Sequence, residues 1–168
     1  SYRLAKLYLR NGDYERAEGA VRQILKKQPD NVAALVECAN CQIKQRKFDE
    51  VLFLLERAME LSPEYVPIYV AMSEYYGITG NVSNQIHFLM VAANKAPEKH
   101  EIRFVVAEKL YRYGDLRGAE DQYRAILRDF PWLENASFAL GILLLKQSRV
   151  TEAVKCFKGI LKNNPAAF

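Results

Sequence analysis

The most constraining feature of this sequence is a ladder of five prolines with a constant spacing of 34 residues. Pro29, Pro63, Pro97, Pro131 and Pro165 keep this spacing without a slip along the 168 residues of the chain. A fixed period of about 20 to 50 residues is typical of a chain built from repeated supersecondary units. Proline cannot donate a helical hydrogen bond, and it restricts the residue before it. Each proline therefore predicts the end of one unit and the start of the next.

The first half of each block of 34 residues predicts an amphipathic helix. A small residue follows a larger apolar residue, and a further side chain of the same face comes three positions later, which is the i, i+3, i+4 spacing of a helix. We expect the small residues to lie where a second helix comes close. They are Ala5, Ala39, Ser73, Ala107 and Gly141.

A tight turn and a second helix are predicted in the other half of each block. Three turns carry glycine, which tolerates positive φ, followed by a side chain that can cap the next helix; they are Gly12-Asp13, Gly80-Asn81 and Gly114-Asp115. Arg46 and Ser148 replace the glycine in the other two turns. A left-handed conformation there would cost up to ~1–2 kcal/mol, so these turns are expected to be strained or differently shaped.

The second helix again shows spacings of three and four along one face. The first buried position of that face is expected to be held by Ala17, Val51, Gln85, Ala119 and Ala153. Pro67 is the sixth proline, and it falls in the first turn of a predicted helix, where a missing N–H costs nothing.

Together these features resemble the tetratricopeptide repeat, whose pattern is W-x2-L-G-x2-Y, then A-x3-F, then P. The resemblance lies in the period, the small residue after a large one, Tyr8 and Tyr76, the Gly-Asp turns, the alanine of the second helix and the closing proline. The tryptophan is missing from every block, and Leu140-Gly141 alone has the Leu-Gly pair. The resemblance implies an all-α fold, an α-solenoid of five helix-turn-helix repeats forming a right-handed superhelix. As a single array over residues 1–168, the repeats would span residues 1–31 (partial), 32–65, 66–99, 100–133 and 134–167.

The same resemblance implies a concave groove, lined by the first helix of each repeat, that binds a peptide or an amphipathic helix of a protein partner. The period assigns to this groove Lys6, Asn40, Lys44, Glu74, Phe104, Glu108, Tyr111, Phe138, Ile142 and Leu145. Packing between neighbouring repeats is the alternative explanation for the apolar positions. Near the C-terminal end, however, the apolar residues are denser than packing requires, and an exposed apolar patch usually marks an interaction site.

Charge in the groove bears on the kind of ligand. Some members of the family grip a C-terminal carboxylate with Lys and Asn side chains, but Val36, Pro67 and Ala71 stand where further such groups would be needed. A carboxylate clamp is therefore not expected. Glu74 and Glu108 instead favour a ligand that carries some positive charge.

Other chemistry finds little support in the sequence. The net charge of +4 is interleaved with acidic residues and forms no basic stripe, so nucleic-acid binding is not expected. Cys38 and Cys41 have CxxC spacing but lie at core positions of a predicted helix, which favours buried structural cysteines. No nucleophile–base pair, metal site or cofactor-binding loop is evident, and we expect no enzymatic activity. The absence of a run of ~18 apolar residues argues against membrane insertion, and three free cysteines favour a reducing, cytoplasmic location.

The last predicted helix is more apolar than the polar outer face of a solenoid cap. Its apolar residues are Val154, Phe157, Ile160 and Leu161. Further repeats in a longer protein would cover them, and we favour this explanation; alternatively, residues 166–168 fold back, or two chains associate end to end. The favoured function is a protein-interaction module. The alternative is a scaffold segment of a larger secretion, envelope or transport assembly, or the targeting arm of an enzyme.

Overall fold

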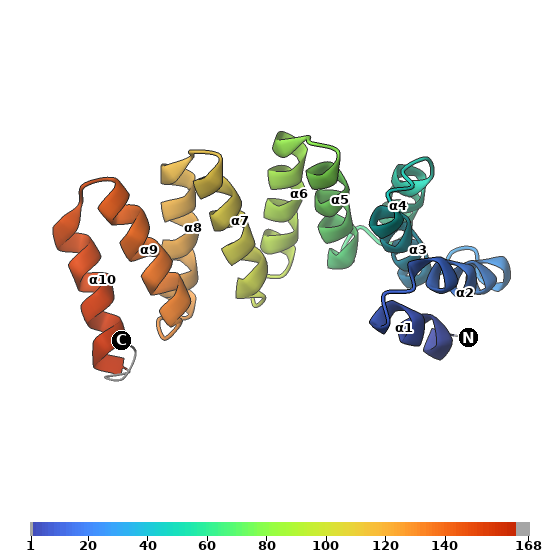
Figure 1. Ribbon diagram of the computed structural model, residues 1–168, viewed down its shortest axis with the longest axis horizontal. Helices are drawn as coiled ribbons and strands as arrows, with labels where there is room; N and C mark the ends of the chain where they lie inside the picture. Colours follow the sequence, from blue (N-terminus) through green and yellow to red (C-terminus); the bar gives the residue numbers. More distant parts are fainter. Residues whose placement is uncertain (1, 164–168) are drawn as a thin grey trace. The chain divides into compact units, whose positions relative to one another are not determined.

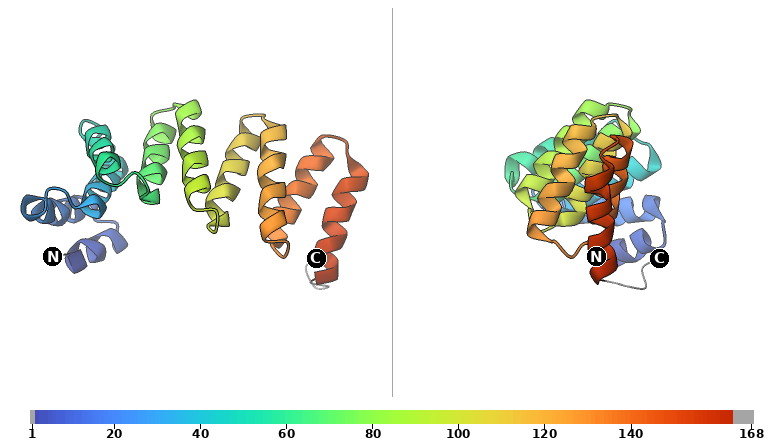
Figure 2. Two further views of the ribbon diagram at one scale, coloured as in Figure 1. Left: turned by 180° about the vertical axis from the view of Figure 1, so that it is seen from behind. Right: turned by 90° about the vertical axis from the view of Figure 1, so that its left-hand side faces the viewer.

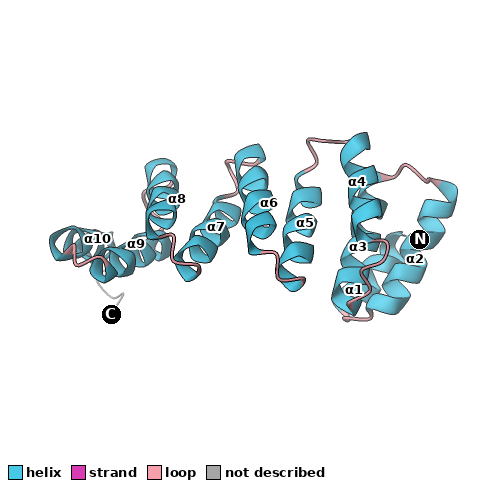
Figure 3. Cartoon of the chain, turned by 90° about the horizontal axis from the view of Figure 1, so that it is seen from above, coloured by secondary structure: helices cyan, strands magenta, loops and turns pink. Residues whose placement is uncertain are grey.

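The computed structural model describes residues 2–163, and within these residues the chain forms ten α-helices joined by short turns (Figures 1 and 3). The predicted all-helical fold is confirmed. The chain divides into two compact units, Ser1–Lys95 and Ala96–Phe168. The first contains α1 (Tyr2–Arg10), α2 (Tyr14–Lys27), α3 (Val32–Gln45), α4 (Val51–Leu61), α5 (Val66–Ile78) and α6 (Val82–Lys95). The second contains α7 (His100–Arg112), α8 (Leu116–Asp129), α9 (Glu134–Lys146) and α10 (Val150–Asn163).

Consecutive helices form antiparallel pairs within each unit, as Figure 2 shows for α9 and α10. In the first unit α1 packs on α2, α3 packs on α2, α4 and α5, and α5 packs on α6. In the second unit α7 packs on α8, and α9 packs on both α8 and α10. A helix pair that also contacts the next pair is the building block of an α-solenoid.

Each proline of the ladder that lies in the described residues occupies the second position of a β-turn. The backbone N–H of Asn31 donates to the carbonyl of Gln28 across Pro29, at 3.2 Å, and the turns at Pro63, Pro97 and Pro131 repeat this bond at 3.0–3.2 Å. Proline fits this position because its ring fixes φ near the value that the turn needs. Gln28 leaves the α region, with φ −138° and ψ 77°, as expected for the residue before proline. Pro165 lies outside the described residues.

The turns between paired helices share one left-handed residue whether or not it is glycine. Arg46 and Ser148 adopt φ of 58° and 61°, close to the φ of 72° at Gly12. The backbone N–H of the following residue closes the turn onto the carbonyl five residues earlier, for example Lys47 to Gln42 at 2.9 Å and Arg149 to Leu144 at 2.9 Å. The glycine-free turns therefore keep the shape of the others, at the cost of a side chain in the left-handed region.

The small residue of each first helix is buried, as the period predicts. Ala39 and Ala107 are fully buried, and Ala5 and Ser73 nearly so. At Gly141 a Cβ atom would lie 2.6 Å from the ring of Phe157, so only glycine allows α9 and α10 to approach this closely. The largest fully buried side chains include Ile43, Leu55 and Ile68 in the first unit and Ile126, Leu143 and Leu144 in the second.

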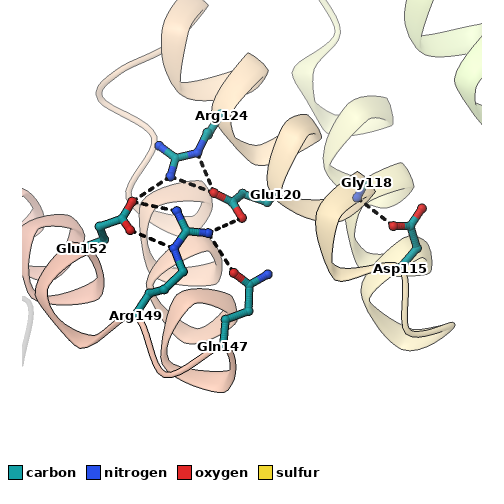
Figure 4. A network of polar contacts seen from close by, with 7 residues as sticks. All are labelled: Asp115, Gly118, Glu120, Arg124, Gln147, Arg149 and Glu152. Carbon is teal, nitrogen blue, oxygen red and sulfur yellow. Dashed lines mark hydrogen bonds and ion pairs between the residues drawn. The ribbon is translucent and has the colours of Figure 1, made fainter.

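A four-member ion network joins α8 to α10 on the second unit (Figure 4). The Glu120 carboxylate, with a side chain only 12% exposed, accepts from Arg124 Nε at 2.9 Å and from Arg149 Nη1 at 2.7 Å. Arg149 also donates twice to Glu152, at 2.8 Å each, and Arg124 Nη2 donates to Glu152 at 3.1 Å. Two carboxylates thus share two guanidinium groups. Such a network stabilises the fold more than an isolated surface ion pair does.

The first unit carries a counterpart of this network, three periods earlier in the sequence. Glu18, Arg22 and Glu50 stand at the positions equivalent to Glu120, Arg124 and Glu152. Arg22 pairs with both carboxylates, donating to Glu18 at 2.9 Å and to Glu50 at 2.5 Å. Gln42 takes the bridging place of Arg149, since its amide nitrogen donates to Glu18 at 3.2 Å and to Glu50 at 2.9 Å.

These networks predict a loss of stability in acid. Burial raises the pKa of Glu120, but hydrogen bonds from Arg149 and Arg124 outweigh burial and hold it below its ordinary value of 4.5. A carboxylate whose pKa is lower in the folded state stabilises the fold fully above its unfolded pKa, and this contribution is lost as pH falls through the folded pKa. We expect the free energy of unfolding, measured in urea, to fall between about pH 6 and pH 3.

The control for this acid sensitivity is Glu120→Gln, which removes the titrating carboxylate and keeps its shape. The variant should be less stable than the wild type at about pH 7 and should lose less stability on acidification. An equal loss in both proteins would show that Glu120 does not contribute to the pH dependence.

Only part of the apolar set predicted for the outer face of α10 is exposed. Ile160 is buried and Phe157 half-buried, whereas Val154 and Leu161 are exposed. The segment 166–168, expected to fold back as one explanation of this face, lies outside the described residues. Within residues 2–163, no helix has the length and apolar character needed to cross a membrane.

Candidate functional site

The second unit contains a pocket of about 460 Å³. Residues from α7, α8 and α9 line it: Phe104, Glu108, Tyr111, Arg112, Tyr123, Asn135, Phe138, Ala139 and Ile142. The volume lies within the ~300–1,000 Å³ range of ligand sites and accommodates one or two large side chains. An apolar wall with a few convergent polar groups is the usual composition of a binding pocket.

Five of the ten residues that the sequence assigns to the groove meet in this pocket. They are Phe104, Glu108, Tyr111, Phe138 and Ile142. Leu145 is not among the lining residues, although it continues the same exposed stripe of α9. The spacing of Phe138, Ile142 and Leu145 is i, i+4, i+7, and all three are 40–45% exposed. Three large apolar side chains on one helix face thus remain open to solvent.

The equivalent positions of the first unit show that packing explains part of the apolar groove. Val36 stands three periods before Phe138, and Ile43 three periods before Leu145. Both are buried in α3, at 2% and 0% exposed. In the first unit these positions stabilise the contacts of α3 with its neighbours, whereas in the second unit they are exposed.

Tyr123 belongs to the buried face of α8 and is only 4% exposed, but it also lines the pocket. Its ring packs edge to face against Phe104, with ring centroids 5.5 Å apart. Burial raises the pKa of Tyr123 to about 12, and the negative charge of Glu108 adds to this shift. A tyrosine combines an apolar ring with a polar hydroxyl group, so the residue type alone is compatible with both packing in the core and lining a pocket.

The sequence also did not assign Arg112, Asn135 and Ala139 to the groove. Arg112 is the last residue of α7, and Asn135 lies in the first turn of α9. Among residues 2–163 no ion pair ends on Glu108 or Arg112. The pocket therefore presents one carboxylate and one guanidinium, one helical turn apart.

The remaining groove residues of the prediction belong to the first unit. Lys44 on α3 forms an ion pair with Glu74 on α5, and this hydrogen bond raises the pKa of Lys44. Asn40 is half-buried on α3. Lys6 is exposed on α1 and lines a second pocket, of about 480 Å³, together with Arg3, Leu7, Leu9 and Arg10. The Glu74 carboxylate, expected to favour a cationic ligand, already has Lys44 as its counter-ion.

Cys38 and Cys41 are fully buried in α3, and burial raises their pKa to about 11 and about 12. Thiols with such pKa values are poor nucleophiles and metal ligands at neutral pH, so the structural interpretation of the CxxC pair is the better one. In the part of the chain that the structure describes, no three His, Cys, Asp or Glu side chains are grouped to hold a metal ion.

Comparison with known proteins agrees with this architecture. Two family models, both described as tetratricopeptide repeat, match residues 8–72 and residues 92–168, which together make up most of the chain. A curated relative, tetratricopeptide repeat protein 21B of Xenopus laevis, is 22% identical over 98% of this chain. The chain spans only 14% of the length of that relative.

Solved structures show the same fold. A crystal structure of MamA has a TM-score of 0.76 at 18% identity, covering 96% of this chain and 88% of its own. YrrB, described as a TPR protein with an unusual peptide-binding site, has a TM-score of 0.70 at 17% identity, with coverage of 99% and 86%. A chain of the Naa15/Naa10 complex bound to HypK-THB has a TM-score of 0.79 at 21% identity, covering 96% of this chain and 24% of its own.

Proposed function

We propose that this chain, which belongs to the tetratricopeptide repeat family, binds a peptide or amphipathic helix of a partner in the pocket of its second unit. Membership of this family makes the chain a protein-interaction module. The fold is a scaffold that presents surfaces to other proteins. The observation that carries the proposal is the exposed stripe of Phe138, Ile142 and Leu145 beside the pocket.

Two further facts support docking at this pocket. The exposed apolar stripe of α9 provides a surface against which the apolar face of an amphipathic helix can pack. Aromatic side chains dominate the energetics of protein interfaces, because each buries a large area at a small cost in conformational entropy. Phe104 and Phe138 stand on adjacent first helices and line the same pocket. A peptide between them would bury both rings.

The proposal predicts that Phe104→Ala combined with Phe138→Ala abolishes partner binding. Hot-spot aromatics commonly contribute about 2 kcal/mol or more each, so we expect about a thirtyfold loss of affinity from each truncation and about a thousandfold loss from the two together. Proteins captured by the wild-type chain are identified by quantitative mass spectrometry, and the affinity of each candidate is then measured with purified components. A partner of this pocket is one that the double variant fails to bind.

The matched control is Phe53→Ala with Trp132→Ala, which removes two aromatic side chains that are more exposed and do not line the pocket. This variant should retain the partner. Since Phe138 also packs on Phe157, at 5.8 Å between ring centroids, Ile142→Asp serves as a variant that leaves the aromatic contacts intact. If folded double and Ile142 variants both bound every partner as the wild type does, the pocket would not be the docking site.

A further inference from the structure

The walls of the pocket in the second unit are unusually aromatic. Phe104, Tyr111, Tyr123 and Phe138 all line it, and the carboxylate of Glu108 lines it with them. The face of an aromatic ring carries partial negative charge and attracts cations, most strongly when the site is partly desolvated. Aromatic side chains grouped with a carboxylate are therefore suited to recognising an organic cation rather than a purely apolar side chain.

The ammonium group of Lys146 already contacts one of these aromatic rings. The Nζ atom of Lys146, on α9, lies 4.6 Å from the centroid of the Tyr111 ring, on α7. This is within the ~6 Å range of a cation–π interaction. The contact shows that Tyr111 is oriented so that a lysine ammonium group can approach its ring. Separately, no ion pair among residues 2–163 involves the carboxylate of Glu108.

We propose that the pocket lined by Phe104, Glu108, Tyr111, Tyr123 and Phe138 binds a lysine or arginine side chain that projects from the partner's peptide. This deepens the proposed function and rests on it, since it assumes that a peptide docks here. The alkyl part of the basic side chain packs on the rings. Its charged end pairs with Glu108 and replaces Lys146 on the face of the Tyr111 ring.

Arg112 opposes this charge preference and so provides a sharp test. It lines the same pocket one helical turn after Glu108 and is the single cation among the lining residues. If the occupant is cationic, Arg112 repels it, and Arg112→Gln should strengthen binding. If the occupant is acidic, Arg112 attracts it, and the same variant should weaken binding. The two kinds of ligand therefore predict opposite signs for one substitution.

The experiment uses the whole chain and a series of fluorescein-labelled peptides of alanine, leucine and glutamine, about 12 residues long, or about three helical turns. The peptides differ at one central position, which is lysine, norleucine or glutamate. Norleucine keeps the alkyl chain of lysine and lacks its charge. Fluorescence anisotropy measures the dissociation constant of each peptide for the wild type, Glu108→Gln and Arg112→Gln.

We expect the lysine peptide to bind about tenfold more tightly than the norleucine peptide, and the glutamate peptide to bind most weakly. Glu108→Gln should remove most of this difference, and Arg112→Gln should enlarge it. Equal binding of lysine and norleucine peptides, lost in Phe104→Ala, would overturn the cation preference and leave groove binding intact. Tighter binding of the glutamate peptide would overturn the preference as well. If no peptide of the series bound, both the cation preference and peptide binding at this pocket would be contradicted.

Discussion

Replacing Leu143 with alanine is expected to lower the free energy of unfolding by about 2–5 kcal/mol, the usual cost of truncating a fully buried leucine. Leu143 is 0% exposed in α9, so its truncation removes apolar contacts and leaves a cavity that rigid neighbouring helices cannot fill. Urea unfolding followed by the fluorescence of Trp132 measures the change, because this tryptophan is unique in the sequence and lies in the second unit.

The matched control is Leu145→Ala, the same chemical change two residues later in the same helix. Leu145 is 43% exposed, so the substitution should cost no more than about 0.5 kcal/mol. The pair tests the assignment of the two faces of α9, since exchanging the faces would exchange the two results. Similar losses at both positions would contradict the burial pattern from which the candidate site is built.

Enlarging Ala107 to leucine is expected to be the second most damaging change, with a cost of about 1–3 kcal/mol. Ala107 is fully buried in α7, which packs directly on α8, and three additional carbon atoms would push the two helices apart. Alanine and leucine have similar helix propensities, so the loss would report packing rather than local helix formation. The same urea titration with Trp132 fluorescence measures it.

Arg117→Leu provides the comparison for Ala107→Leu. Arg117 is exposed on α8, in the same unit, and arginine and leucine are close in helix propensity. The substitution should therefore change stability by less than about 0.5 kcal/mol. If the two leucine variants were equally stable, Ala107 could not lie at a close helix crossing.

Much of the fold was predictable because the same kind of residue recurs at equivalent packing positions of each repeat. One small residue such as Ala107 is weak evidence for a helix crossing, but five at one spacing are strong evidence. The prolines act locally, by fixing φ in a β-turn, and so their role could be derived from the sequence. The turn at Arg46 was less predictable, because the hydrogen bond from Lys47 to Gln42 is what holds this non-glycine residue in the left-handed region.

The candidate site was predictable only in part. The period assigned Phe104, Glu108 and Phe138 to the groove, because residues at equivalent positions of the 34-residue repeat leave their helices in the same direction. Tyr123 and Arg112 were not included in this assignment. Tyr123 comes from a second helix, α8, whereas Arg112 stands two periods after Lys44, so the period could have assigned it to the groove. Whether such side chains reach a common space depends on the distances between helices, which no spacing in the sequence contains.

By itself, the sequence determined the repeat length, the helix pairs and the direction in which each side chain leaves its helix, because these follow from backbone periodicity and local turn chemistry. Only the tertiary structure decided whether the apolar side chains assigned to the groove are buried or exposed. Val36 and Phe138 occupy equivalent positions of the repeat, yet Val36 is 2% exposed and Phe138 is 45% exposed. The physical reason is that burial depends on the side chains of neighbouring helices, which differ between the two units. The position of a residue within the repeat does not fix those neighbours.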